Sequence, residues 1–125
     1  MKKIWSISLV FIVLAGKGTE SRGQEGEYDV VIHGATAGGT IAAIAAAGEG
    51  MDVLLIEPGK NVGGMVTGGL SHNDYGDRTV IGGMALEFYK KVAAHYQKPL
   101  YYWRGPEPYV GEKIFRDWLE EAGVT

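Results

Sequence analysis

Hydrophobic and polar positions divide the chain into a few clear segments. Residues 28–33 and 52–57 are short apolar runs rich in β-branched side chains, which is typical of strands buried in a parallel sheet. Between them, residues 40–47 are nearly all alanine or isoleucine, and their small side chains favour a helix packed closely on that sheet. The order strand, helix, strand predicts a βαβ unit and therefore an α/β fold.

Two amphipathic helices are expected further along the chain. One covers residues 83–96; the other has Pro108 in its first turn and ends at Gly123. Their apolar stripes are most simply core. Residues 124–125 then begin what should be another sheet strand, so we expect the fold to be incomplete within this sequence. The two stripes consist of Ile81, Met84, Ala85, Phe88, Val92, Ala93 and Tyr96, and of Val110, Ile114, Phe115, Trp118, Leu119 and Ala122.

The first 15 residues have the pattern of an export signal. Lys2 and Lys3 form a basic start, and residues 4–15 are almost wholly apolar. This run is shorter than the roughly 20 residues of a bilayer-spanning helix but typical of a signal peptide. Cleavage after Ala15 would leave a polar linker over residues 16–27 and an exported protein without a stable membrane span. A buried helix or an uncleaved anchor is the alternative.

Composition and charge narrow the possible functions. The chain is 46% hydrophobic and 22% charged, as expected of a globular protein. Removing Lys2 and Lys3 with the signal leaves 10 basic against 15 acidic residues, so nucleic acid is not an expected partner. The absence of cysteine excludes thiolate metal sites from this sequence. Glycine accounts for 20 of the 125 residues, more than twice the average usage of about 7%.

A glycine-rich turn connects the first strand to the first helix. Such a turn places unpaired N–H groups and the positive end of the helix dipole beneath a pyrophosphate. Gly34 would form the turn, and Gly39 would let the helix pack closely on the strand. Thr36 replaces the middle glycine of the G-x-G-x-x-G pattern, and a helix-capping threonine is the alternative interpretation of this position. The turn consists of Gly34, Ala35, Thr36, Ala37, Gly38 and Gly39.

Glu57 ends the second strand, 18 residues after Gly39. At this spacing a carboxylate accepts hydrogen bonds from a ribose 2′-hydroxyl, and it would repel a 2′-phosphate. Strand, turn, helix, strand and acid together predict a dinucleotide site. A phosphate loop of the nucleotide-hydrolase type is excluded because Thr40 stands where that loop requires lysine.

The loop after Glu57 favours a flavin over a nicotinamide cofactor. It begins at Pro58 and contains two double glycines, at residues 63–64 and 68–69. A nicotinamide dehydrogenase would ordinarily continue into a crossover helix, for which this stretch is too rich in glycine. The loop can instead bring backbone N–H groups against a second part of the cofactor.

Residues 28–57 with Gly63 and Gly64 resemble the glutathione-reductase-like flavoprotein fold. More narrowly, four segments resemble the FAD-dependent oxidoreductase family found in many exported bacterial proteins. They are HGATAGG at 33–39, GGMVTGGL at 63–70, IGG at 81–83 and EPYV at 107–110. The resemblance covers residues 28–124 and implies a three-layer, Rossmann-like FAD/NAD(P)-binding domain with a parallel sheet. It also implies hydride transfer from a small organic substrate to bound FAD.

The resemblance assigns the glycine turn to the FAD pyrophosphate and Glu57 to the adenosine ribose. The family tolerates threonine at the position of Thr36. Many flavoproteins have arginine where Met65 stands, so backbone donors would have to suffice there. Met65 could pack near the isoalloxazine ring or simply anchor the loop. The cofactor-binding set is Gly34, Ala35, Thr36, Ala37, Gly38, Gly39, Glu57, Pro58, Gly63, Gly64, Met65 and Thr67.

Catalytic residues are not assigned by the sequence. His72 or Asp74, in the polar cluster 71–78, could move a proton during oxidation, but a polar turn is the alternative. Four aromatic residues could form a substrate wall or pack under a long loop: Tyr101, Tyr102, Trp103 and Tyr109. No metal is expected, since one histidine with loop acids specifies no geometry. An NAD-dependent dehydrogenase and a non-catalytic flavin-binding module are kept as alternative functions.

Overall fold

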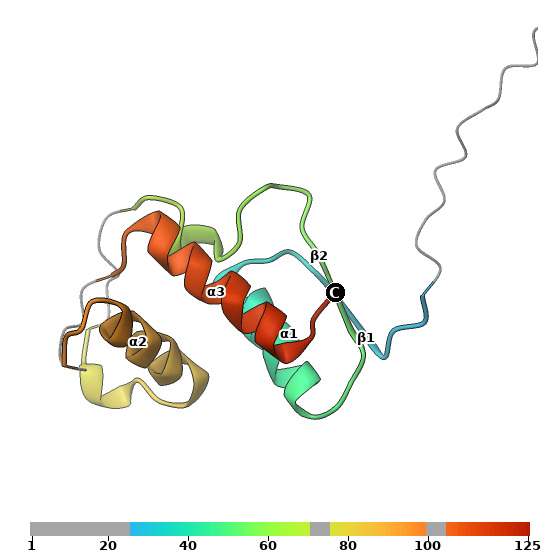
Figure 1. Cartoon of the computed structure of the whole chain (residues 1–125), viewed down its shortest axis with the longest axis horizontal. Helices are drawn as coiled ribbons and strands as arrows, with labels where there is room; N and C mark the ends of the chain where they lie inside the picture. The colour runs from blue at the N-terminus through green and yellow to red at the C-terminus, as the bar shows by residue number, and fades with distance from the viewer. Residues whose placement is uncertain (1–25, 71–75, 100–104) are drawn as a thin grey trace, which may run out of the picture.

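The computed structural model describes residues 26–70, 76–99 and 105–125 (Figure 1). The predicted signal peptide and most of the predicted linker lie outside these residues. The α/β class is confirmed, with a small parallel sheet and three α-helices among the described residues. In chain order the elements are β1 (Val30–His33), α1 (Ala37–Gly48), β2 (Val53–Ile56), the 3-10 turns η1 (Gly64–Val66) and η2 (Arg78–Val80), α2 (Gly83–His95) and α3 (Pro108–Ala122).

The two strands run parallel, and α1 connects them as predicted. Their register pairs Val30 with Val53 at one end and His33 with Ile56 at the other. After α3 the chain returns to the outer edge of β2. There the Thr125 N–H donates to the Val53 carbonyl at 3.0 Å, and the Thr125 carbonyl accepts from the Leu55 N–H at 2.8 Å. These bonds are the start of parallel pairing, as expected for residues 124–125.

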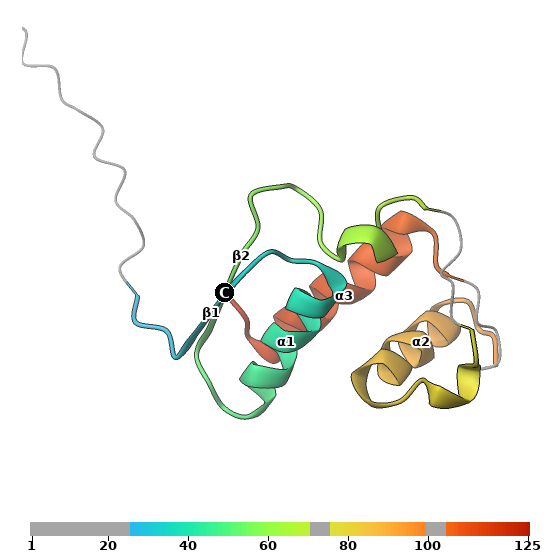
Figure 2. The same cartoon turned by 180° about the vertical axis from the view of Figure 1, so that it is seen from behind.

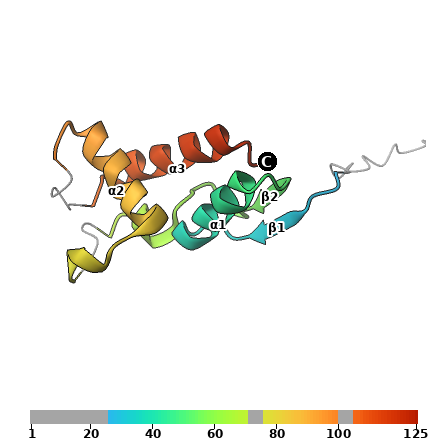
Figure 3. The same cartoon turned by 90° about the horizontal axis from the view of Figure 1, so that it is seen from below.

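Both α1 and α3 lie against the same face of the sheet (Figure 3). Leu55 is on that face and packs against the core cluster. Val31 and Ile56, on the opposite face, are 57% and 41% exposed. The described residues therefore form two layers, and the third layer of the expected fold stays a prediction.

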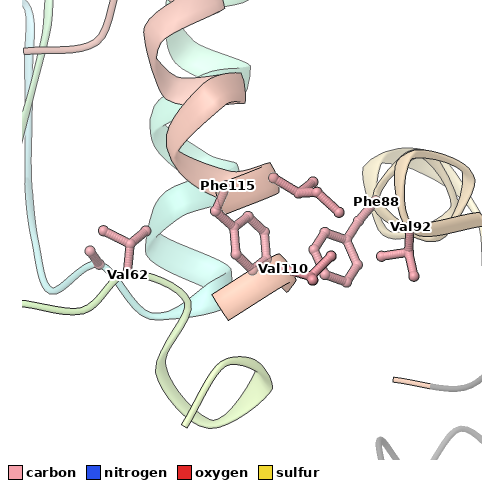
Figure 4. Close-up of a cluster of buried hydrophobic side chains, with 7 residues drawn as sticks. Val62, Phe88, Val92, Val110 and Phe115 are labelled. Carbon is pink, nitrogen blue, oxygen red and sulfur yellow. The ribbon is translucent and has the colours of Figure 1, made fainter. Parts of the chain in front are cut away.

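The hydrophobic core lies mainly between the helices. Phe88 of α2 and Phe115 of α3 stack with their ring centroids 4.5 Å apart (Figure 4). Helix α2 lies at the end of the molecule away from the sheet (Figure 2). Both amphipathic stripes contribute to this core, which confirms them except at Ala85, whose side chain is exposed. The buried cluster consists of Ala35, Val62, Phe88, Val92, Val110, Ile114 and Phe115.

Local signals in the sequence explain where the helices begin and end. Pro108 occupies the first turn of α3, and Gly123 ends that helix with φ of 74°. Helix α1 begins earlier than predicted because the Thr36 hydroxyl accepts a hydrogen bond from the Gly39 N–H at 3.1 Å. None of the described helices is long and apolar enough to cross a membrane.

Candidate functional site

The turn between β1 and α1 has the predicted backbone conformation. Gly34 has φ of 102°, a backbone conformation that residues with a side chain rarely adopt. Its N–H donates to the Ile56 carbonyl at 2.7 Å, so the turn begins where the two strands are still joined. Ala35 follows and is only 1% exposed. The start of α1 is thereby fixed at the carboxyl edge of the sheet.

Gly39 permits the close approach of α1 to this turn. A Cβ atom at Gly39 would lie 2.1 Å from the Gly34 carbonyl oxygen. Because that obstacle is backbone, no side-chain adjustment can relieve it. The predicted packing role of Gly39 is therefore confirmed.

The first turn of α1 presents backbone donors. Thr36 is the N-cap, so its hydroxyl satisfies the Gly39 N–H. The N–H groups of Ala37 and Gly38 have no acceptor among the described residues. Together with the helix dipole they are suited to an anion. The capping interpretation of Thr36 thus holds for its side chain, and a contact between Thr36 and a cofactor stays a prediction.

The second glycine segment docks directly on this turn. The Gly63 N–H donates to the Ala35 carbonyl at 2.7 Å, and Thr36 and Gly63 form a parallel β-bridge. Gly64 has φ of 54°, and a Cβ there would lie 3.2 Å from the Thr36 Cα. The structure therefore brings together the two glycine segments that the sequence singled out.

Two other predicted residues occupy contrasting positions in the same loop. Thr67 is buried, and its hydroxyl donates to the Val62 carbonyl at 2.6 Å. This hydrogen bond joins the two ends of the segment 62–67. Met65 is 79% exposed, so it does not anchor the loop through burial. Contacts of Thr67 and Met65 with a cofactor stay predictions.

Glu57 uses both carboxylate oxygens to hold the turn and the loop. Oε1 accepts from the Gly59 N–H and Oε2 from the Ala35 N–H, each at 2.8 Å. These bonds, the one from Gly59 first, lower the pKa of the Glu57 carboxyl below its ordinary value. An ionised carboxylate has about four acceptor positions, so it can also accept from hydroxyl groups. Pro58 lies exposed between Glu57 and Gly59.

Two cavities flank the glycine turn. One of about 280 Å³ lies beside Glu57, with apolar walls from Leu55, Val62 and Leu119 and cationic groups from Lys60 and Arg116. The other, of about 320 Å³, is almost wholly apolar and lies at the start of α1. Its lining includes Gly38, Ile41, Val66, Tyr89 and Phe115. The residues around the glycine turn therefore line two cavities, one with charged groups beside Glu57 and one almost wholly apolar at the start of α1.

Two residues of α3 that were not predicted from the sequence, Glu112 and Arg116, hold the glycine loop. Glu112 accepts from the Asn61 side chain at 2.9 Å and from the Val62 N–H at 3.3 Å. Arg116 donates to the Lys60 carbonyl at 2.6 Å. The only local signal is the spacing of Glu112 and Arg116, four residues apart on a helix.

Several predictions fall partly or wholly outside the described residues. His72, Asp74 and the aromatic residues 101–103 lie outside them. Tyr109, the fourth aromatic residue of that prediction, lies in the first turn of α3 and not in a loop, and it is 71% exposed. Within the described part of the polar cluster, the Asp77 carboxylate accepts from the Thr79 N–H at 2.9 Å, which fits the polar-turn alternative. No group of three metal-ligating side chains was found in residues 26–70, 76–99 and 105–125.

Fold and local geometry together are those of a Rossmann-like dinucleotide-binding domain. The family model described as FAD dependent oxidoreductase matches residues 29–125, and the chain belongs to this family. A search of curated proteins found no match. Membership identifies the protein as a flavin-dependent oxidoreductase with FAD as its cofactor. This decides against the NAD-dependent dehydrogenase and the non-catalytic module.

Proposed function

We propose that the protein oxidises a small organic substrate by hydride transfer, with the FAD diphosphate bound over residues 34–39. The observation that carries this proposal is the docking of Gly63 and Gly64 on the glycine turn, beside the Ala37 and Gly38 N–H groups. The N–H groups of Ala37 and Gly38 lie at the start of α1, and the docked residues Gly63 and Gly64 carry no Cβ atom. A diphosphate suits this position because the N–H groups can donate to its oxygens and the positive end of the helix dipole stabilises its negative charge.

The adenosine end of the cofactor is proposed to lie beside Glu57. The carboxylate retains acceptor positions for ribose hydroxyls after binding Ala35 and Gly59. The cavity of about 280 Å³ next to it combines apolar walls with the polar groups of Lys60 and Arg116. An aromatic base with polar edges suits such a lining.

Bound FAD would supply a hydride acceptor that amino-acid side chains lack. The chain's own contribution is to bind the diphosphate, orient the ribose and keep the glycine loop closed through Thr67. Met65, exposed on that loop, is proposed to pack against the flavin end. Proton transfer by His72 or Asp74 remains a hypothesis.

Titration of the full-length, cofactor-free protein with FAD and with NAD tests this function. We expect FAD to bind at least about tenfold more tightly than NAD, followed by quenching of flavin fluorescence and by calorimetry. The FAD complex should be yellow, and small alcohols, amines and sugars should be screened for loss of the oxidised flavin absorbance. Binding of NAD without FAD, or of neither, would contradict the proposal.

A further inference from the structure

We propose that Glu112 and Arg116 of α3 are positioning residues for the cofactor site. They hold residues 60–62 so that Gly63 and Gly64 dock on the glycine turn. This inference rests on the proposed binding of FAD over residues 34–39. It assigns to α3 a role that neither its amphipathic pattern nor the family's glycine motifs indicate.

Glu112 binds the segment through two groups. Its Oε2 accepts from Asn61 Nδ2 at 2.9 Å, and its Oε1 accepts from the Val62 N–H at 3.3 Å. The Glu112 side chain is only 17% exposed. The bonds from Asn61 and Arg116 hold the pKa of its carboxyl below the ordinary value, so the group acts as an ionised acceptor. Charge-assisted bonds of this kind are stronger than neutral ones.

We call Glu112 and Arg116 together the clamp on residues 60–62. Arg116 contributes the contact with Lys60, the residue before Asn61. Its Nη2 donates to the Lys60 carbonyl at 2.6 Å and also to Glu112 Oε1 at 2.6 Å. Its Nε donates to the same carboxylate oxygen at 2.9 Å. The planar guanidinium can serve both partners at once, which a lysine ammonium does with less geometric definition. Residues 60–62 are thus held by two side chains one helical turn apart.

The clamp ends next to the residue that joins the two glycine segments. Gly63 follows Val62 directly and donates to the Ala35 carbonyl. A Cβ at Gly63 would lie 2.5 Å from Thr67 Cγ2 and 2.8 Å from the Phe115 ring, so the backbone there is tightly enclosed. A displacement of Val62 would therefore move Gly63 and Gly64 relative to the turn.

A matched control exists on the same helix. Lys113 and Asp117 form an ion pair at 2.7 Å with the same four-residue spacing as Glu112 and Arg116. Their side chains are 67% and 50% exposed. Neither has a hydrogen bond to residues 60–62 in the part of the chain that the structure describes. Asp117→Ala therefore removes a helix ion pair without removing a loop contact.

The test compares Glu112→Ala, Glu112→Gln and Asp117→Ala in the full-length protein. We expect the FAD dissociation constant to rise roughly tenfold in Glu112→Ala and to stay within about twofold of wild type in Asp117→Ala. Glu112→Gln should lie between them, because its amide oxygen can still accept from Val62. The FAD-free proteins should also differ: hydrogen exchange at Val62 and Gly63 should accelerate in Glu112→Ala but not in Asp117→Ala.

The two readouts separate failure of this inference from failure of the proposed function. If wild type does not bind FAD, the proposed function fails, and exchange at Gly63 still decides whether the clamp exists. Equal FAD affinities and equal exchange in Glu112→Ala and Asp117→Ala would overturn the inference. If Glu112→Ala does not fold, Glu112→Gln and Arg116→Lys provide the same comparison, and both must weaken FAD binding more than Asp117→Ala does.

Discussion

Glu57 illustrates how a single carboxylate serves both folding and the proposed site. By accepting from Ala35 and Gly59, it ties the glycine turn to the loop that follows β2. The same group is the candidate ligand of the ribose. Its ionisation therefore affects the stability of the cofactor-free protein as well as the affinity for FAD.

Acid should weaken the contribution of Glu57 to stability. Because its pKa is lowered on folding, the ionised carboxylate stabilises the protein above its unfolded-state pKa, and this stabilisation is lost as pH falls through the folded-state pKa. The free energies of unfolding of wild type and Glu57→Gln, measured by denaturant titration, should converge as the pH falls below the ordinary glutamate pKa and through the lowered folded-state pKa. Asp77 and Glu112 also have lowered pKa values, but they are present in both proteins. A constant difference would contradict this expectation.

At the scale of elements, the approach of α1 to β1 is set by a residue without a side chain. The helix is capped by Thr36, and its first turn passes so close to Gly34 that position 39 has no room for a Cβ. The same approach places the helix N-terminus at the edge of the sheet. The packing of α1 on β1 and the position of the candidate anion site therefore both depend on the close approach of Gly39 to Gly34.

Gly39→Ala should destabilise the protein strongly. We expect a loss of about 3 kcal/mol or more in the free energy of unfolding, since the obstructing atom is a backbone oxygen. Gly48→Ala is the matched control, because it lies at the other end of α1 and its Cβ would meet no atom within 4 Å. Greater helix propensity should leave that variant as stable as wild type or slightly more stable. Similar urea midpoints for both variants would contradict the close-packing explanation.

For the whole molecule, the sequence predicted the elements better than the contacts between them. Periodicity identified α2 and α3, and Pro108 and Gly123 marked the ends of α3, because these signals are local. The docking of Gly63 on Ala35 was not predicted, because the family resemblance assigned the two segments only to the cofactor. The clamp by Glu112 was missed because its partner Val62 is 50 residues away and has no helical periodicity to reveal it.

The inward orientation of Thr67 has a similar explanation. Its position between glycines made it a candidate for contact with a cofactor, whereas its hydroxyl is buried against Val62. A hydroxyl can satisfy a loop carbonyl or a ligand equally well, and only the folded backbone distinguishes them. Export through residues 1–15 stays a prediction, since those residues lie outside the described structure.

Binding of the FAD diphosphate at the start of α1 can be tested by placing a negative charge at Gly38. Gly38 is exposed, and a Cβ there would meet only the Thr36 hydroxyl, at 3.9 Å. Gly38→Glu should not destabilise the cofactor-free protein, because an acid in the first turn favours a helix. Gly38→Gln controls for size, and Ala42→Glu places the same charge at an exposed position one turn further on.

The measurement is the FAD dissociation constant of these variants at low ionic strength, with thermal stability recorded in parallel. We predict that Gly38→Glu weakens FAD binding by about tenfold or more relative to Gly38→Gln, while Ala42→Glu stays closer to wild type. Equal FAD affinity of Gly38→Glu and Gly38→Gln, with both proteins folded, would show that the diphosphate does not bind at the start of α1.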